Sequence, residues 1–294
     1  MATLGNVPRV VPAERRQPIW LIPNLLSLDA PLVAVAWLYI FAKTWRVDYL
    51  PWAAYASLGL VVWVIYVVDR LLDVAAGGTK GVLAARHEFH GSHRRLFGIG
   101  AVLAGLLAAS LVISGLPLTI YGYGIVGGVM VLGFFSLAIF SPADRNELPY
   151  TKNILAGLSF AYGTAFLAHA YTPSNLYNLV RSPELVCFAV LCILNIFAID
   201  LWEDAGRSSD PETKAGDELA LTLPLTLLGA ASLVFALKDP DLTTRPFFYA
   251  ILTGAALLQI LNRSRARFQM DTLRVLADVA MLVPFVVFLA FLRG

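Results

Sequence analysis

Charged residues are scarce in this chain of 294 residues, where they make up 14%. A typical soluble domain carries about 25%. Hydrophobic residues make up 58% of the chain, and its mean hydropathy is +0.71. The formal net charge of +2 is too small to indicate a nucleic-acid partner. This composition excludes an ordinary soluble protein and predicts an integral membrane protein surrounded by a lipid bilayer.

Cysteine is almost absent as well. Cys187 and Cys192 lie five residues apart in one apolar stretch. On a helix they would point to different faces, so no disulfide is predicted between them. The first 17 residues contain three arginines but no apolar run, so the sequence does not predict a signal peptide.

Long apolar stretches dominate the rest of the chain and predict an all-α, multi-pass membrane fold. Stretches of about 17 to 22 residues are long enough to cross a bilayer as helices. We predict nine transmembrane helices around a central cavity, at residues 25–43, 51–69, 97–115, 119–140, 154–171, 183–202, 219–237, 246–262 and 273–292.

Lysine and arginine alternate between the two predicted sides of the membrane. Sixteen of the 22 fall in the N-terminal segment and the loops after the second, fourth, sixth and eighth stretches, or at their edges. Because basic loops stay in the cytoplasm, we expect the N-terminus and these loops to be cytoplasmic.

Two acidic motifs close apolar stretches at that same side. They are Asp69-Arg70-Leu71-Leu72-Asp73 and Asp200-Leu201-Trp202-Glu203-Asp204. Aspartates four residues apart share one face of a helix. Both motifs would lie at helix C-termini, where the helix dipole disfavours carboxylates, so we expect a cationic group to compensate them.

The two motifs also belong to a weak internal repeat. Asn24 opens the first stretch and Asn153 the fifth, while Asp69 and Asp200 are 131 residues apart. We therefore expect one transmembrane domain over 1–294, built from a duplicated four-helix unit (about 24–150 and 153–262) and a ninth helix. Two such units would bring the acid pairs together.

Carboxylate clusters beside basic residues suit a Mg²⁺-bound diphosphate. Mg²⁺ takes oxygen ligands and shares phosphate oxygens with carboxylates, while lysine and arginine bind the remaining oxygens. Aromatic side chains in the predicted helices suit a prenyl tail, and their faces can stabilise a carbocation. The candidates are Trp37, Trp63, Tyr66, Phe160, Tyr162, Phe166, Phe197 and Trp202.

In its predicted helices and its two acidic motifs, the chain resembles the UbiA superfamily of intramembrane prenyltransferases. That family has nine helices, an Asn-Asp-x-x-Asp-x-x-x-Asp motif after the second and an Asp-x-x-x-Asp motif after the sixth. Asp69 and Asp73 match the end of the first motif, and Asp200 and Asp204 match the second. Lys152 resembles the lysine with which the family binds diphosphate.

The chain also departs from the family pattern. Ile65 and Tyr66 stand where the first motif begins with Asn and Asp, and Asn153 stands where an arginine usually follows the lysine. The first metal site is therefore leaner than the family's. The resemblance implies two Mg²⁺ ions held by Asp69, Asp73, Asp200 and Asp204, with Lys152 as a further catalytic residue.

The reaction implied is ionisation of an allylic prenyl diphosphate and transfer of the prenyl group to an acceptor, with the site facing the cytoplasm. The residues assigned to substrate binding are Tyr66, Arg70, Arg86, Asn153, Tyr162 and Asn195.

Two other functions stay open. One is terpene cyclisation, in which the diphosphate reacts without an aromatic or other acceptor. The other is a cation or proton transporter, because intramembrane acids often mark ion pathways. Asp29 and Asp278 are the better candidates for such a pathway, and we interpret both as interfacial or helix-packing residues.

Overall fold

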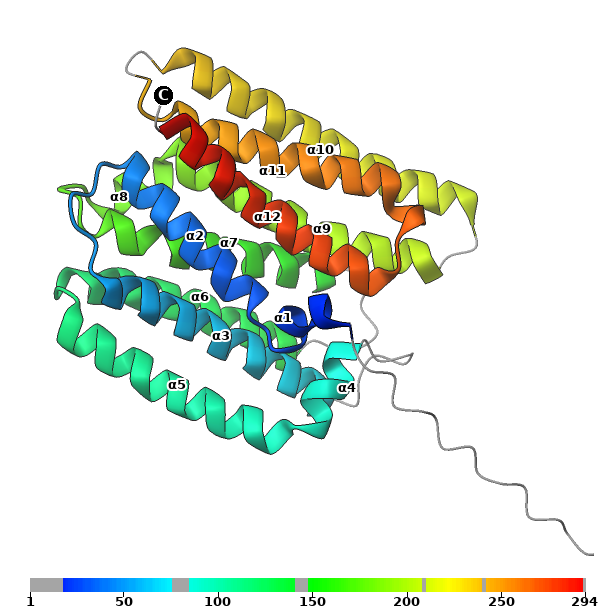
Figure 1. Ribbon diagram of the computed structural model, residues 1–294, viewed down its shortest axis with the longest axis horizontal. Coiled ribbons are helices and arrows are strands. Elements are labelled where there is room, and N and C mark those ends of the chain that lie inside the picture. Colours follow the sequence, from blue (N-terminus) through cyan, green and yellow to red (C-terminus); the bar gives the residue numbers. More distant parts are fainter. Residues whose placement is uncertain (1–17, 76–84, 141–147, 208–209, 240–241, 293–294) are drawn as a thin grey trace, which may run out of the picture.

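The computed structural model describes residues 18–75, 85–140, 148–207, 210–239 and 242–292. Within these ranges the chain forms helices and no β-strand, which confirms the all-α prediction. The nine predicted stretches each correspond to one long helix (Figure 1), namely α2 (Asp29–Thr44), α3 (Trp52–Ala75), α5 (Arg94–Gly115), α6 (Thr119–Phe140), α7 (Leu148–His169), α9 (Pro183–Arg207), α10 (Pro211–Lys238), α11 (Arg245–Ser264) and α12 (Met270–Leu292).

Short helices lie at the two ends of the long ones (Figure 1). Near one end are α1 (Ile22–Leu25) and α4 (Ala85–Ser92), and near the other is α8 (Leu176–Arg181). Two 3₁₀ turns, η1 (Ile19–Leu21) and η2 (Arg265–Arg267), precede α1 and follow α11.

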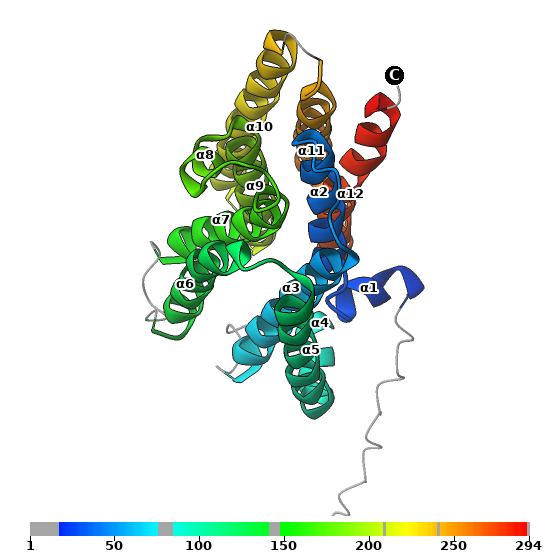
Figure 2. The ribbon, with the colours of Figure 1, turned by 90° about the vertical axis from the view of Figure 1, so that its left-hand side faces the viewer.

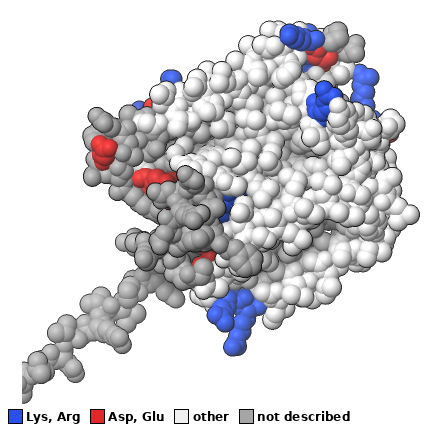
Figure 3. Space-filling view, turned by 180° about the vertical axis from the view of Figure 1, so that it is seen from behind, with Lys and Arg blue, Asp and Glu red and all other residues white. Residues whose placement is uncertain are grey.

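Five described helices, α5, α6, α9, α10 and α12, are long and apolar enough to cross a membrane, and α1 with α2 would make a sixth as one bent span. Many large apolar side chains of α5 and α6 are exposed, as expected for helices that face lipid. Figure 3 shows a broad uncharged face with the charged side chains near its margins. An integral membrane protein is therefore supported, while nine crossings and a cytoplasmic N-terminus remain predictions.

The core is centred on α2, which contacts α3, α7, α11 and α12. Trp37 and Phe41 of α2 are fully buried, and Trp37 stacks on Phe188 of α9 with ring centroids 4.3 Å apart. The indole Nε1 of Trp37 donates to the carbonyl of Met281 in α12 at 2.9 Å. Aromatic packing thus joins helices that are far apart in the sequence.

The chain bends by 78° between α1 and α2. Ser27 at this break has a positive φ of 57°. Asn24 Nδ2 donates to Asp29 Oδ2 at 2.6 Å across the break, and Trp63 Nε1 of α3 donates to the carbonyl of Leu26 at 2.9 Å. These bonds satisfy polar groups that the break would otherwise leave unpaired in the protein interior.

Helices α7 and α9 lie side by side (Figure 2), and they approach closely at Gly157. A Cβ atom on this residue would lie 2.8 Å from the backbone nitrogen of Ile193 and 2.9 Å from its Cα. Only glycine fits there without moving one backbone, so the absence of a side chain at residue 157 sets the distance between the two helices.

We predict that Gly157→Ala destabilises the protein by about 1–3 kcal/mol, because overpacking forces the two backbones apart. Gly163→Ala, on the same helix with nothing within 4 Å of the added Cβ, is the matched control and should be neutral or stabilising. Thermal unfolding of the purified protein in detergent measures both. Equal melting temperatures for the two variants would contradict the assigned contact.

Candidate functional site

The two acidic motifs meet at consecutive residues of α7. Lys152 Nζ lies 3.5 Å from Asp69 Oδ1 of α3. Asn153 Nδ2 donates a hydrogen bond to Asp200 Oδ2 of α9. Because α7 contacts both α3 and α9, it brings together acids that are 131 residues apart in the chain.

This arrangement supplies the positive charge that the sequence led us to expect. Lys152 and Asn153 lie near the beginning of α7, whereas the acids lie near the ends of α3 and α9. The side chains of Lys152 and Asp69 are 30% and 28% exposed. Water therefore reaches both groups and weakens their attraction. The lysine also lies over the ring of Phe134, 5.2 Å from its centroid. The site is thus charged at its rim and aromatic beneath.

Asp73 and Asp204 lie one helical turn beyond Asp69 and Asp200 on the same helices. Asp73 is half-buried and Asp204 is exposed. Within the described residues, no three His, Cys, Asp or Glu side chains come close enough to share one metal ion. The donor set fits Mg²⁺ in chemistry, because it consists of carboxylate oxygens that a phosphate could bridge.

The remaining side chains of the second motif connect α9 to two other helices. Trp202 Nε1 donates to Asn262 Oδ1 of α11 at 3.0 Å. Glu203 Oε1 accepts from both Nε and Nη2 of Arg274 in α12, at 3.2 and 2.5 Å. Arg274 also donates to Asp271 at 2.8 Å. Asp200, Trp202 and Glu203 therefore contact three different helices, which fixes the end of α9.

Of the two arginines assigned to the substrate, Arg70 has other surroundings. Arg70 is buried, and its Nη1 donates to the carbonyl of Asn24 at 3.3 Å, so it holds α1 against α3. This contact favours a structural role for Arg70 over diphosphate binding. Arg86 lies in α4, but its side chain is outside the described part of the structure.

A small cavity lies deeper between the helices. Its volume is about 30 Å³, and it is lined by Ala30, Val33, Tyr66, Phe160, Cys192, Asn195, Ile196, Asp278 and Met281. Tyr66 and Asn195 were predicted to bind substrate, and both reach it. A single water occupies about 30 Å³ in the liquid, so a prenyl chain enters only if the surrounding side chains rearrange.

Tyr162 lies elsewhere. Its hydroxyl donates to the carbonyl of Tyr123 in α6 at 2.9 Å, and its ring stacks on Phe166. It is nine residues from Asn153, about 13 Å along the helix by the usual rise. The structure thus favours packing between α6 and α7 as the role of Tyr162.

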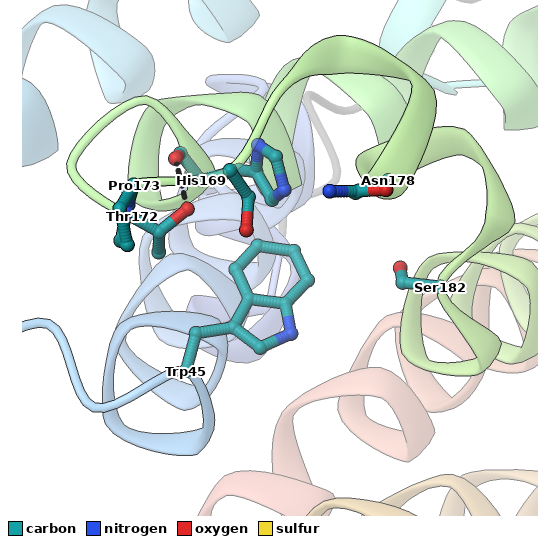
Figure 4. Close-up of a pocket in the computed structure, with 7 residues that line it drawn as sticks. Trp45, His169, Thr172, Pro173, Asn178 and Ser182 are labelled. Carbon is teal, nitrogen blue, oxygen red and sulfur yellow. Dashed lines mark hydrogen bonds between the residues drawn. The ribbon is translucent and has the colours of Figure 1, made fainter.

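A second cavity of about 310 Å³ lies at the opposite end of the long helices (Figure 4). The indole of Trp45 faces the imidazole of His169, with Asn178 and Ser182 to one side. His169, the last residue of α7, is buried in the protein. Hydroxyl, amide and aromatic groups line this cavity, and none of the described lining residues is a lysine, arginine or acid. It therefore suits a neutral ligand and not a diphosphate.

Sequence reasoning missed Arg274, and it did not place Asp278 near the residues predicted to bind substrate. Arg274 holds the second motif, and Asp278, interpreted as interfacial or packing, lines the central cavity. The two residues are opposite charges four residues apart within the apolar stretch 273–292, a signal that favours functional or paired residues.

No family model, curated protein or solved structure matches the chain.

We predict that Arg274→Met lowers the free energy of unfolding by roughly 2–3 kcal/mol, because charged hydrogen bonds to Glu203 and Asp271 are lost. Arg267→Met, at the exposed last residue of η2, should change the free energy of unfolding by no more than about 0.5 kcal/mol. Denaturant or thermal unfolding in detergent distinguishes them. An unchanged free energy of unfolding for Arg274→Met would show that the pairing of Arg274 with Glu203 does not hold α9.

Proposed function

We propose that this protein is a Mg²⁺-dependent intramembrane enzyme that ionises an allylic prenyl diphosphate and transfers the prenyl group to an acceptor, as its resemblance to the UbiA superfamily implies. The observation that carries the proposal is the convergence of Asp69 and Asp200 on Lys152 and Asn153. Two carboxylates from separate motifs contact a lysine and the asparagine next to it at the end of an apolar bundle.

The groups at this position match the needs of a diphosphate leaving group. Asp69 and Asp200, with Asp73 and Asp204 one turn away, would hold the metal ions that bridge to the diphosphate oxygens. When bound, Mg²⁺ would neutralise the charge that develops on the leaving group. Lys152 would exchange its contact with Asp69 for diphosphate oxygens.

Asn153 has a positioning role in this proposal. Its amide donates to Asp200, which leaves the other oxygen of that carboxylate for a metal ion. The amide is neutral where the family has an arginine. The positive charge beside these acids therefore comes from Lys152, which contacts Asp69. Placing these groups in advance, in a site of low dielectric, favours charge separation on ionisation.

The surrounding helices suit the rest of such a substrate. A prenyl chain is apolar and reaches the enzyme from the bilayer, and α5 and α6 next to α3 and α7 expose apolar side chains toward lipid. The cavity lined by Tyr66 and Phe160 places aromatic faces below the charged rim.

We predict that Asp69→Asn and Asp200→Asn each reduce Mg²⁺-dependent release of diphosphate by roughly 10²–10³-fold, the size of losing one electrostatic contact to a developing charge. Asp48→Asn, at an exposed aspartate between α2 and α3 at the other end of the bundle, is the control and should keep full activity. The assay follows diphosphate released from C10 to C20 prenyl diphosphates by purified protein, with Mg²⁺ or with EDTA.

Full activity in both variants, or activity that EDTA leaves unchanged, would contradict the proposal. A ring-containing hydrocarbon or alcohol formed without an acceptor would replace transfer by cyclisation. Cation flux in liposomes without consumption of diphosphate would replace the enzyme by a transporter.

A further inference from the structure

The polar groups of the central cavity are a carboxyl group, an amide and a phenol hydroxyl, and no lysine, arginine or histidine is among its described lining residues. Asp278 enters from α12, Tyr66 from α3 and Asn195 from α9. From this lining we infer that Asp278 faces the allylic cation of the reaction and accepts the proton whose loss ends it. This inference rests on the proposed function and adds a catalytic residue to it.

The cavity lies directly below the proposed diphosphate site on the same helices. Tyr66 precedes Asp69 by three residues, Asn195 precedes Asp200 by five, and Phe160 follows Asn153 by seven. At the usual helical rise these separations are about 4.5, 7.5 and 10.5 Å, all toward the interior of the bundle. The allylic carbon is joined to the diphosphate through one oxygen, so a diphosphate bound at Lys152 would direct that carbon toward this cavity.

The lining favours a positive charge at that position. Asn195 Oδ1 is buried and has no hydrogen-bond partner among the described residues. A buried acceptor without a partner is costly, and a cation beside it would offset that cost. Tyr66 and Phe160 add aromatic faces, which attract cations. An acid, an orphan amide oxygen and two rings therefore surround the same small space.

Asp278 is the carboxylate that lines the cavity, and we assign the proton transfer to it on that ground. Asp29 is the other acid near Tyr66, but its two oxygens accept bonds from Asn24 Nδ2 and from the backbone nitrogen of Ala30, at 2.6 and 3.0 Å. Asp29 is thus engaged in the bend between α1 and α2, and it does not line the cavity. Asp278 lines it from α12.

The chemistry balances with these groups. The bond between the allylic carbon and oxygen breaks, and both electrons leave with the diphosphate. The π electrons of an acceptor, or of the substrate's own distal double bond, then form the new carbon–carbon bond and leave a second cation. A C–H bond next to that cation gives its electrons to a new double bond and its proton to the Asp278 carboxylate. The same step ends either transfer to an aromatic acceptor or cyclisation.

A binding experiment tests this without knowledge of the acceptor. The probes are dimethylammonium ions carrying C10, C15 or C20 prenyl chains, which imitate the cation, together with inorganic diphosphate and Mg²⁺. Titration calorimetry on the full-length protein compares the wild type with Asp278→Asn. We expect Asp278→Asn to bind the ammonium at least ten-fold more weakly and inorganic diphosphate equally well, since the latter binds at the rim.

Three comparisons show whether the negative charge of the Asp278 carboxylate is responsible for ammonium binding. Asp278→Glu keeps a carboxylate and should retain most of the ammonium affinity. Asp271→Asn, on the same helix but paired with Arg274 and not in the cavity, should match the wild type. A neutral probe with carbon in place of the ammonium nitrogen should bind wild type and Asp278→Asn alike. If Asp278→Asn does not retain diphosphate binding, Asp278→Ser takes its place in the same comparisons.

The outcomes separate this inference from the function on which it rests. Equal ammonium binding by wild type and Asp278→Asn, or an equal loss for the neutral probe, would overturn the role of Asp278 and leave the proposed enzyme standing. A wild-type protein that binds no diphosphate in the presence of Mg²⁺ would overturn the proposed function and this inference with it.

Discussion

The close contact between α7 and α9 at Gly157 is the constraint on which the site depends. With no side chain at this residue, the first turns of α7 reach the end of α9, and Asn153 meets Asp200. Since α7 also contacts α3, the neighbouring Lys152 meets Asp69. One small residue thus places two acids from distant parts of the chain against neighbouring residues of α7, Lys152 and Asn153.

The charged residues at the end of the bundle that carries the acidic motifs fall into two groups according to their contacts. Glu203 and Arg70 are engaged in contacts that hold helices together, with Arg274 and with the carbonyl of Asn24. Breaking such buried contacts is costly, because a charge left without a partner in the interior loses its hydration. Asp69 and Asp200 contact groups that a ligand could replace, so they are better suited to binding.

Depth within the bundle organises the proposed chemistry. Charged groups lie at the rim, aromatic rings and the Asp278 carboxylate lie within, and a separate uncharged cavity beside Trp45 lies at the far end. Such layering would hold a diphosphate where water and metal ions have access, and keep its apolar chain and the reactive cation inside. Exclusion of water from the interior would also protect the cation from capture as an alcohol.

The sequence by itself determined nine helices and the helix ends that carry the two acidic motifs, because apolar length and helical spacing are local properties. It also singled out Lys152, Asn153, Tyr66 and Asn195, while the number of membrane crossings and the internal repeat stay predictions. Only the tertiary structure decided that Arg70 and Tyr162 serve packing contacts and that Asp278 lines the cavity. Those outcomes depend on which helix faces meet across more than a hundred residues of chain, which no local pattern records.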